Sequence, residues 1–149
     1  MSAFPAPELR VGFEGVTPIL RVTDLPAGIA YYVQKLGFKL DWEYPYFASL
    51  SRGKCHLFLS LGDQGHTGSW VWIGVEDAAH LHEEYLKSGA KIRHKPTNYN
   101  WAYEMQVEDL DGNVLRMGSE PKDAPEGEWL DMNGRTWPPT TAVEKKPLD

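Results

Sequence analysis

The sequence has few of the residues that disulfides, metal clusters and membrane spans require. Its 149 residues include one cysteine, Cys55, which excludes an intrachain disulfide and a cysteine-rich metal site. No apolar stretch approaches the length of about 18 residues that a membrane helix needs. Residues 1–10 also lack the basic and apolar regions of an export signal. We therefore expect a cytoplasmic protein that does not associate with membranes.

Basic residues are also scarce. Lys and Arg total 15 against 21 Asp and Glu, which gives a net charge of -6. Binding to nucleic acid needs clustered cations, and the sequence has no such cluster. The acidic balance suits a cationic ligand slightly better than an anionic one. No Ser-His-Asp spacing, phosphate-binding loop or dinucleotide fingerprint is present.

The most informative stretch is residues 101–118, WAYEMQVEDLDGNVLRMG, which is typical of a β-hairpin. Apolar residues such as Met105 alternate with polar residues such as Glu104. The turn formers at 109–112 favour a three-residue loop, with Gly112 at a positive φ. This loop places Glu104 opposite Arg116, so we predict an ion pair between them. The same register places Gln106 opposite Val114.

Two helices are predicted from caps and apolar stripes. Asp24 is a suitable N-cap and Gly37 a stop for the first helix, and Asp77 and Gly89 have the same roles in the second. The buried stripes are expected to contain Ile29, Tyr32, Val33 and Leu36 in the first helix and Ala78, Leu81 and Tyr85 in the second. Alternation predicts strands over residues 17–23, 38–44, 47–50, 55–61, 69–75 and 91–96, with Leu57, Leu59 and Leu61 facing the core.

The two halves of the sequence repeat one another. Val22, Asp24 and Tyr32 recur 53 residues later as Val75, Asp77 and Tyr85. Each half therefore has the order βαβββ, and a repeat of this kind is a structural unit used twice. We predict an α+β fold of paired βαβββ modules, residues 17–62 and 69–119, that form a curled mixed sheet with the helices on its outer face.

Segments outside the predicted 17–119 domain lack this periodicity. Residues 1–16 are expected to form an N-terminal arm. Residues 120–149 form a C-terminal tail rich in proline and charge. Within this tail, Trp129 and Trp137 either attach to the domain surface or belong to a flap over a pocket or a partner subunit.

The candidate site lies on the sheet faces that the helices leave free. The residues in phase with those faces are Ile19, Arg21, His56, Phe58, Ser60, Trp70, Trp72, Glu104, Gln106, Val114 and Arg116. Trp70 and Trp72 either stack on a flat aromatic ligand or pack in a dimer core. His56 alone among the histidines faces this region, so no metal site is predicted from them. The predicted ligand-binding residues are Phe58, Ser60, Trp70, Trp72, Trp101, Glu104, Gln106 and Arg116.

Two segments resemble the vicinal-oxygen-chelate superfamily, which includes glyoxalase I, extradiol dioxygenases and bleomycin-resistance proteins. They are LRVTDLPAGIAYYVQKLGF at 20–38 and EMQVEDLDGNVLRMG at 104–118. The resemblance implies the same paired βαβββ fold, usually dimeric, with a ligand pocket in the curled sheet. The ligand positions of its metal-dependent members correspond here to Thr17, Ser60 or Phe58, Trp70 and Arg116. No residue there suits a divalent ion, and Arg116 is a permanent cation that would repel one.

This departure is similar to the bleomycin-resistance branch of the superfamily. The resemblance therefore implies a homodimer that needs no metal or cofactor and sequesters a small aromatic compound, as in antibiotic resistance, and the acidic net charge favours a cationic one. An enzyme of the same superfamily, a lyase, isomerase or dioxygenase with an atypical site, is the alternative, with Glu104 or Asp111 as a general base. No other catalytic residue is indicated. A structural or regulatory dimer without a ligand is the third hypothesis.

Overall fold

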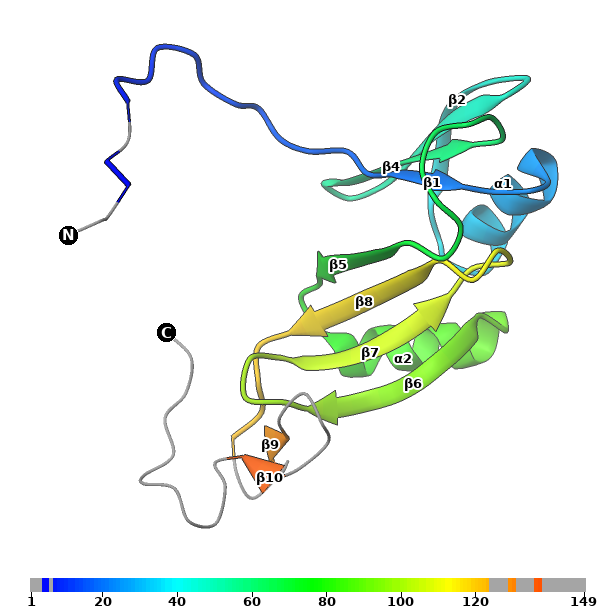
Figure 1. Ribbon diagram of the computed structural model, residues 1–149. Coiled ribbons are helices and arrows are strands. Elements are labelled where there is room, and N and C mark those ends of the chain that lie inside the picture. Colours follow the sequence, from blue (N-terminus) through cyan, green and yellow to red (C-terminus); the bar gives the residue numbers. More distant parts are fainter. Residues whose placement is uncertain (1–3, 6, 124–128, 131–135, 138–149) are drawn as a thin grey trace.

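The computed structural model describes residues 4–5, 7–123, 129–130 and 136–137, and it contains two βαβββ modules (Figure 1). The first comprises β1 (Ile19–Arg21), α1 (Leu25–Gln34), β2 (Lys39–Tyr44), β3 (Phe47–Arg52) and β4 (Cys55–Ser60). The second comprises β5 (Trp70–Gly74), α2 (Ala78–Ser88), β6 (Lys91–Asn98), β7 (Tyr103–Glu108) and β8 (Val114–Ser119). The predicted α+β fold is confirmed.

A short antiparallel pair follows, formed by β9 (Trp129–Leu130) and β10 (Thr136–Trp137). The roles predicted for the side chains of Trp129 and Trp137 lie outside what the structure describes.

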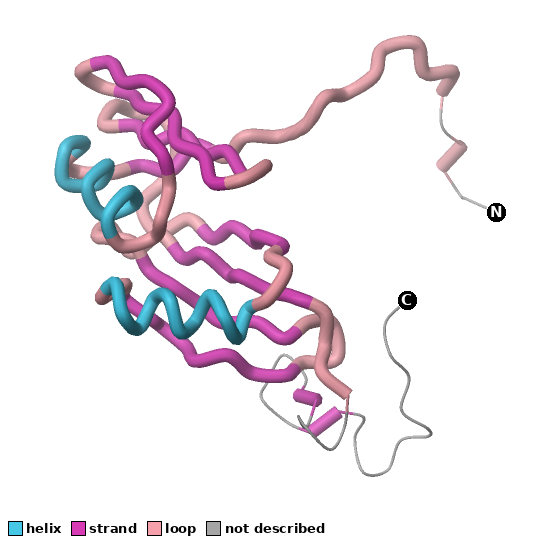
Figure 2. The backbone as a smooth tube through the Cα atoms, turned by 180° about the vertical axis from the view of Figure 1, so that it is seen from behind, coloured by secondary structure: helices cyan, strands magenta, loops and turns pink. Residues whose placement is uncertain are grey.

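Each module forms its own four-stranded sheet. Sheet A has the strand order β1-β4-β3-β2, and sheet B has the equivalent order β5-β8-β7-β6. In both, the first strand runs parallel to the last and the other neighbours are antiparallel. Helix α1 packs on sheet A and α2 on sheet B, so each sheet has one face covered by a helix (Figure 2). Within the described part of the chain, neither helix is long and apolar enough to cross a membrane.

Both helices begin where the sequence predicts, and α2 also ends as predicted, at Gly89. Helix α1 ends earlier than predicted, at Gln34 with Lys35 as its C-cap, so Leu36 and Gly37 follow it. The Asp24 carboxylate accepts the N–H of Ala27 at 3.0 Å, and the Asp77 carboxylate accepts the N–H of His80 at 3.0 Å. Gly89 ends α2 in the left-handed conformation with φ 81°.

The prediction that Val33 and Leu61 face the core is wrong. Val33 is 37% exposed because the buried stripe of α1 is centred on Gly28 and Tyr32, and Val33 lies at its edge. Leu61 is also 37% exposed because β4 ends at Ser60. Strand β6, in contrast, continues past Pro96 to Asn98, which an edge strand tolerates because an outward N–H is not needed.

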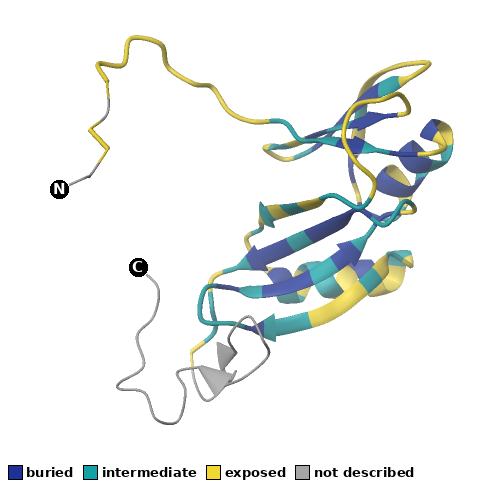
Figure 3. Cartoon of the chain, in the orientation of Figure 1, coloured by how far each residue is buried: buried dark blue, intermediate teal, exposed yellow. Residues whose placement is uncertain are grey.

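The two modules share one apolar core, and residues coloured as buried occur in both (Figure 3). Tyrosine hydroxyl groups also join the modules through hydrogen bonds. Tyr31 in α1 donates its hydroxyl to the Glu108 carbonyl at 2.6 Å, and the neighbouring Tyr32 donates to the Asp109 carboxylate at 2.8 Å. In the opposite direction, Tyr85 in α2 donates to the Leu36 carbonyl at 2.9 Å. These hydroxyl groups satisfy backbone and carboxylate acceptors that the interface removes from water.

The predicted register of the β7–β8 hairpin is wrong by two residues. The connection spans residues 109–113, because the Asp109 carboxylate accepts the N–H groups of both Asp111 and Asn113. The observed pairs are Glu104 with Gly118 and Gln106 with Arg116. A two-residue shift keeps every side chain on its predicted face, since side chains alternate with a period of two.

Candidate functional site

The structure divides the predicted ligand-binding residues between the two sheets. Phe58 and Ser60 lie on β4 of sheet A. The other six belong to sheet B or its loops: Trp70 and Trp72 on β5, Trp101 before β7, Glu104 and Gln106 on β7, and Arg116 on β8. Within one chain, the candidate site therefore consists of two separate aromatic surfaces.

Glu104 is the centre of the sheet B surface. Its carboxylate is almost fully buried and accepts hydrogen bonds from three side chains. Arg116 donates from Nε at 2.8 Å and from Nη2 at 3.0 Å, and Trp72 donates its indole N–H at 3.2 Å. The indole N–H of Trp101 donates to the same carboxylate. A buried charge is tolerated here because it is both paired and hydrogen-bonded.

These donors also fix the protonation state of Glu104. Burial by itself raises the pKa of this carboxyl group, but the hydrogen bonds from Arg116, Trp101 and Trp72 outweigh burial and hold the pKa below its usual value. The hydrogen bond to Glu104 in turn raises the pKa of Arg116. Glu104 is therefore an ionised structural anchor at neutral pH.

Indole rings and guanidinium groups occupy the surface around this anchor. Trp70 is 52% exposed and Trp72 is 51% exposed. The guanidinium of Arg93 lies 4.9 Å from the ring centre of Trp70. Tyr99 and Trp101 stack with centroids 4.6 Å apart and planes 7° apart. Exposed rings that are held by their neighbours in this way lose little conformational freedom when another group packs against them.

Arg93 is missing from the residues predicted by sequence. It lies in β6, where the pairing with β7 shifts between Ile92 and His94 and again between His94 and Thr97. Alternation does not assign a face to a residue in such an irregular stretch, so the sequence pattern could not place Arg93 on this surface.

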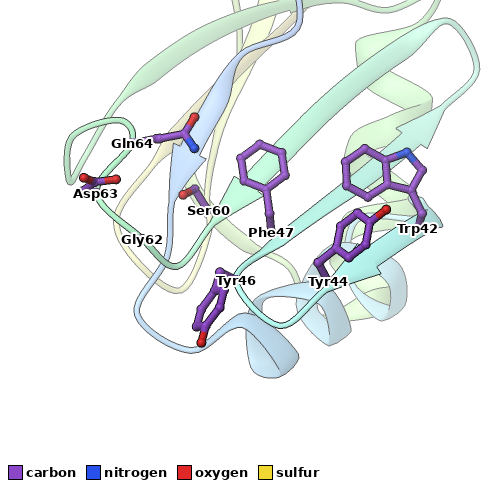
Figure 4. Close-up of a pocket in the computed structure, with 8 residues that line it drawn as sticks. All are labelled: Trp42, Tyr44, Tyr46, Phe47, Ser60, Gly62, Asp63 and Gln64. Carbon is purple, nitrogen blue, oxygen red and sulfur yellow. The ribbon is translucent and has the colours of Figure 1, made fainter.

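Sheet A carries a second aromatic surface beside a cavity of about 450 Å³ (Figure 4). The cavity is lined by Trp42, Tyr44, Tyr46, Phe47, Ser60, Gly62, Asp63 and Gln64. The ring of Phe47 lies 5.1 Å from that of Phe58 and 6.1 Å from that of Trp42. Of these residues the sequence predicted only Phe58 and Ser60. The alternation of Trp42 with Tyr44 is the same signal that identified Trp70 and Trp72.

A groove of about 970 Å³ runs between the two modules. Its apolar wall includes Leu57, Val71 and Ile73, and the bidentate ion pair of Arg52 with Glu84 borders it. Within the described ranges, no three His, Cys, Asp or Glu side chains gather closely enough to hold a metal ion.

The residues at the metal-ligand positions of the metal-dependent relatives do not fit a divalent ion. Arg116 is bound to Glu104, and Trp70 lies under Arg93. Thr17 and Ser60 offer neutral hydroxyl groups. The carboxylate nearest to these positions, Glu104, already accepts four N–H groups.

Comparison with known proteins identifies related sequences and structures. The model of the Glyoxalase/Bleomycin resistance protein/Dioxygenase superfamily matches residues 15–117. A search of curated proteins gave no match. The chain is similar to the solved bleomycin-binding protein from bleomycin-producing Streptomyces verticillus, complexed with copper(II)-bleomycin, with 27% identity and a TM-score of 0.60 over 74% of this chain and 98% of that chain.

Two further solved structures share the fold. TioX from Micromonospora sp. ML1 has 20% identity and a TM-score of 0.62, covering 74% of this chain and 98% of that one. Lactoylglutathione lyase from Agrobacterium tumefaciens has 16% identity and a TM-score of 0.60, covering 70% and 92%. At these identities the similarity concerns the fold alone.

Proposed function

This chain belongs to the glyoxalase/bleomycin resistance protein/dioxygenase superfamily, and on that premise we propose that it is a metal-free small-molecule binding protein. It binds a flat aromatic compound and acts by sequestration, as a drug-binding protein does in antibiotic resistance. The similarity to a bleomycin-binding protein at 27% identity supports this proposal.

The main support for this proposal is that indole rings are exposed beside ordered polar groups. Trp70 and Trp72 present about half of their surface to solvent, while Glu104 and Arg116 hold the adjoining side chains in place. Isolated exposed apolar residues are common, but adjacent aromatic rings around a buried ion pair are typical of a binding surface.

The charges around the exposed rings do not favour the cationic ligand that the net charge of the chain suggested. That expectation used the whole-chain value of -6. The charges next to the exposed rings are instead two arginines, Arg93 and Arg116, and one carboxylate, Glu104. Local charge decides which ligand is favoured because exposed charges farther away than about 10 Å are screened by salt.

The enzymatic alternative has no supporting observation in the described residues. A general base needs a carboxylate that is free to take a proton. Glu104 accepts four N–H groups and its pKa is lowered, while the Asp111 carboxylate accepts both the backbone N–H and the hydroxyl of Thr23. Both carboxylates have structural partners.

We also propose that the protein is a cytoplasmic homodimer. Edge strand β5 borders the groove between the modules, and Trp42, Trp70 and Trp72 are exposed on the free faces. A second copy would cover these surfaces and bring sheet A of one protomer to sheet B of its partner, which unites the two aromatic surfaces. A single cysteine suits a reducing compartment.

A thermal-shift screen of flat aromatic compounds, run with and without chelator, tests the proposed function. A ligand at 100 times its dissociation constant should stabilise the fold by about 2.7 kcal/mol, and chelator should not change this. Trp70→Ala should reduce the shift, whereas Leu86→Ala, which removes an exposed side chain from α2, should not. Stoichiometric metal in the purified protein, or stabilisation that requires added metal, would contradict a metal-free site.

A further inference from the structure

The sheet B surface carries an arginine that has no carboxylate partner. On this face Lys91 pairs with Glu108 at 3.1 Å, and Arg116 pairs with Glu104 at 2.8 Å. Arg93 lies on the same face, and among the described residues no ion pair reaches it. Arg93 is thus a cation beyond the two ion pairs, although the whole chain has a net charge of -6.

Arg93 is nevertheless held in a defined position. Its Nη1 donates to the side-chain oxygen of Gln106, and its guanidinium lies over the ring of Trp70 at 4.9 Å. Arginine stacked on an indole ring loses part of its side-chain freedom before any ligand binds. An exposed arginine fixed in this way is suited to recognising an anion.

Gln106 lies between Arg93 and Arg116. It is paired directly with Arg116 across β7 and β8, and it accepts the hydrogen bond from Arg93. Arg116 uses Nε and Nη2 for Glu104, so its Nη1 has no hydrogen-bond partner among the described residues. The Nε and Nη2 groups of Arg93 are likewise without such a partner in the described part of the chain. Two guanidinium groups thus present free N–H donors on either side of one amide.

We propose that this surface binds a planar aromatic acid, with the ring against the indoles and the anionic oxygens on Arg93 and Arg116. This inference rests on the proposed function and specifies the ligand. Guanidinium groups bind carboxylates through paired, charge-assisted hydrogen bonds. Trp70, Trp72 and Trp101 surround the same donors and provide the apolar contact. Glu104 does not repel the ligand, because its charge is matched by Arg116.

Three probes of the same shape and different charge test the proposal. They are 2-naphthoate, its neutral amide 2-naphthamide and the cation 2-naphthylmethylammonium, each titrated into the full-length protein by calorimetry. We expect 2-naphthoate to bind at least tenfold more tightly than the other two. Its affinity should fall as salt is increased, since the contact is between exposed charges.

Variants then assign the preference to Arg93. Because this side chain is exposed, Arg93→Gln should leave the melting temperature close to that of the wild type. We expect Arg93→Gln to weaken binding of 2-naphthoate about tenfold and to leave binding of 2-naphthamide unchanged. Lys87→Gln, which removes an exposed cation from α2 on the covered side of sheet B, should change neither affinity.

The possible results distinguish a failure of the proposed ligand class from a failure of the proposed function. Equal or tighter binding of the amide or the ammonium probe would overturn the inference and leave an aromatic-binding protein. An unchanged 2-naphthoate affinity in Arg93→Gln would also overturn it. Failure of all three probes to bind at millimolar concentration would contradict the inference and the proposed function together.

Discussion

Glu104 and Arg116 form a bidentate ion pair although they occupy diagonal positions on β7 and β8. Their direct partners are Gly118 and Gln106, and the long arginine side chain crosses to reach the carboxylate at 2.8 and 3.0 Å. The Glu104 side chain is 1% exposed and that of Arg116 is 31% exposed. The carboxylate is therefore buried, with the arginine as the wall between it and solvent.

Removing the arginine should destabilise the protein. Arg116→Met leaves the buried Glu104 carboxylate with only the two indole donors, and we expect the free energy of unfolding to fall by about 2–3 kcal/mol. The double variant Glu104→Met/Arg116→Met should recover part of this loss because no buried charge is left unpaired. Urea unfolding of the wild type and the variants measures both effects. An Arg116→Met protein as stable as the wild type would show that the pair is effectively solvated.

The same pair predicts a dependence of stability on pH. The pKa of Glu104 is lower in the folded protein than in the unfolded chain, because hydrogen bonds outweigh burial. Its contribution to stability is therefore complete above the unfolded pKa of about 4.3 and is lost as pH falls through the folded pKa. We expect the stability difference between the wild type and the double variant to be constant from pH 6 to 7 and to shrink below pH 4. Urea unfolding at each pH measures it, and a difference that grows in acid would have the wrong sign.

Much of the fold was predictable because it depends on local patterns. Caps such as Asp24 and Asp77 use short hydrogen bonds within the chain, and the alternation in β7 and β8 assigns faces without knowledge of the register. The register itself failed because it depends on the Asp109 carboxylate, which accepts two backbone N–H groups and lengthens the loop. Turn-forming composition predicts that a loop exists and says little about which hydrogen bonds close it.

The candidate site was only partly predictable. The alternation of Trp70 and Trp72 and the opposite charges of Glu104 and Arg116 are sequence signals, and the structure joins Trp72, Glu104 and Arg116 by hydrogen bonds. Phe58 belongs to sheet A, and its distance from the sheet B residues depends on how the two modules pack, which is decided by tertiary contacts such as Tyr32 with Asp109. Periodicity within a module contains no information about that packing.

The face assignment of β8 has its own test. Leu115 is fully buried in the shared core, so Leu115→Asp places an unpaired charge there and should prevent folding at room temperature. Leu110→Asp makes the same chemical change in the exposed β7–β8 connection and should be tolerated. Circular dichroism and urea unfolding of the two variants measure the difference. Tolerance of Leu115→Asp would mean that β8 presents the opposite face to the core.

The proposed homodimer predicts a mass in solution twice that of the chain. Light scattering at micromolar concentration measures this mass directly. If the free sheet faces form the interface, Trp70→Glu should shift the protein towards the monomer while its circular dichroism stays native, because the ring is half exposed and the new charge would be desolvated only in a dimer. Val33→Glu places the same charge on α1, at a side chain that is also partly exposed, and should leave the dimer intact. A wild-type monomer would contradict the proposal, and a dimer in which Val33→Glu dissociates and Trp70→Glu does not would place the interface on the helices instead.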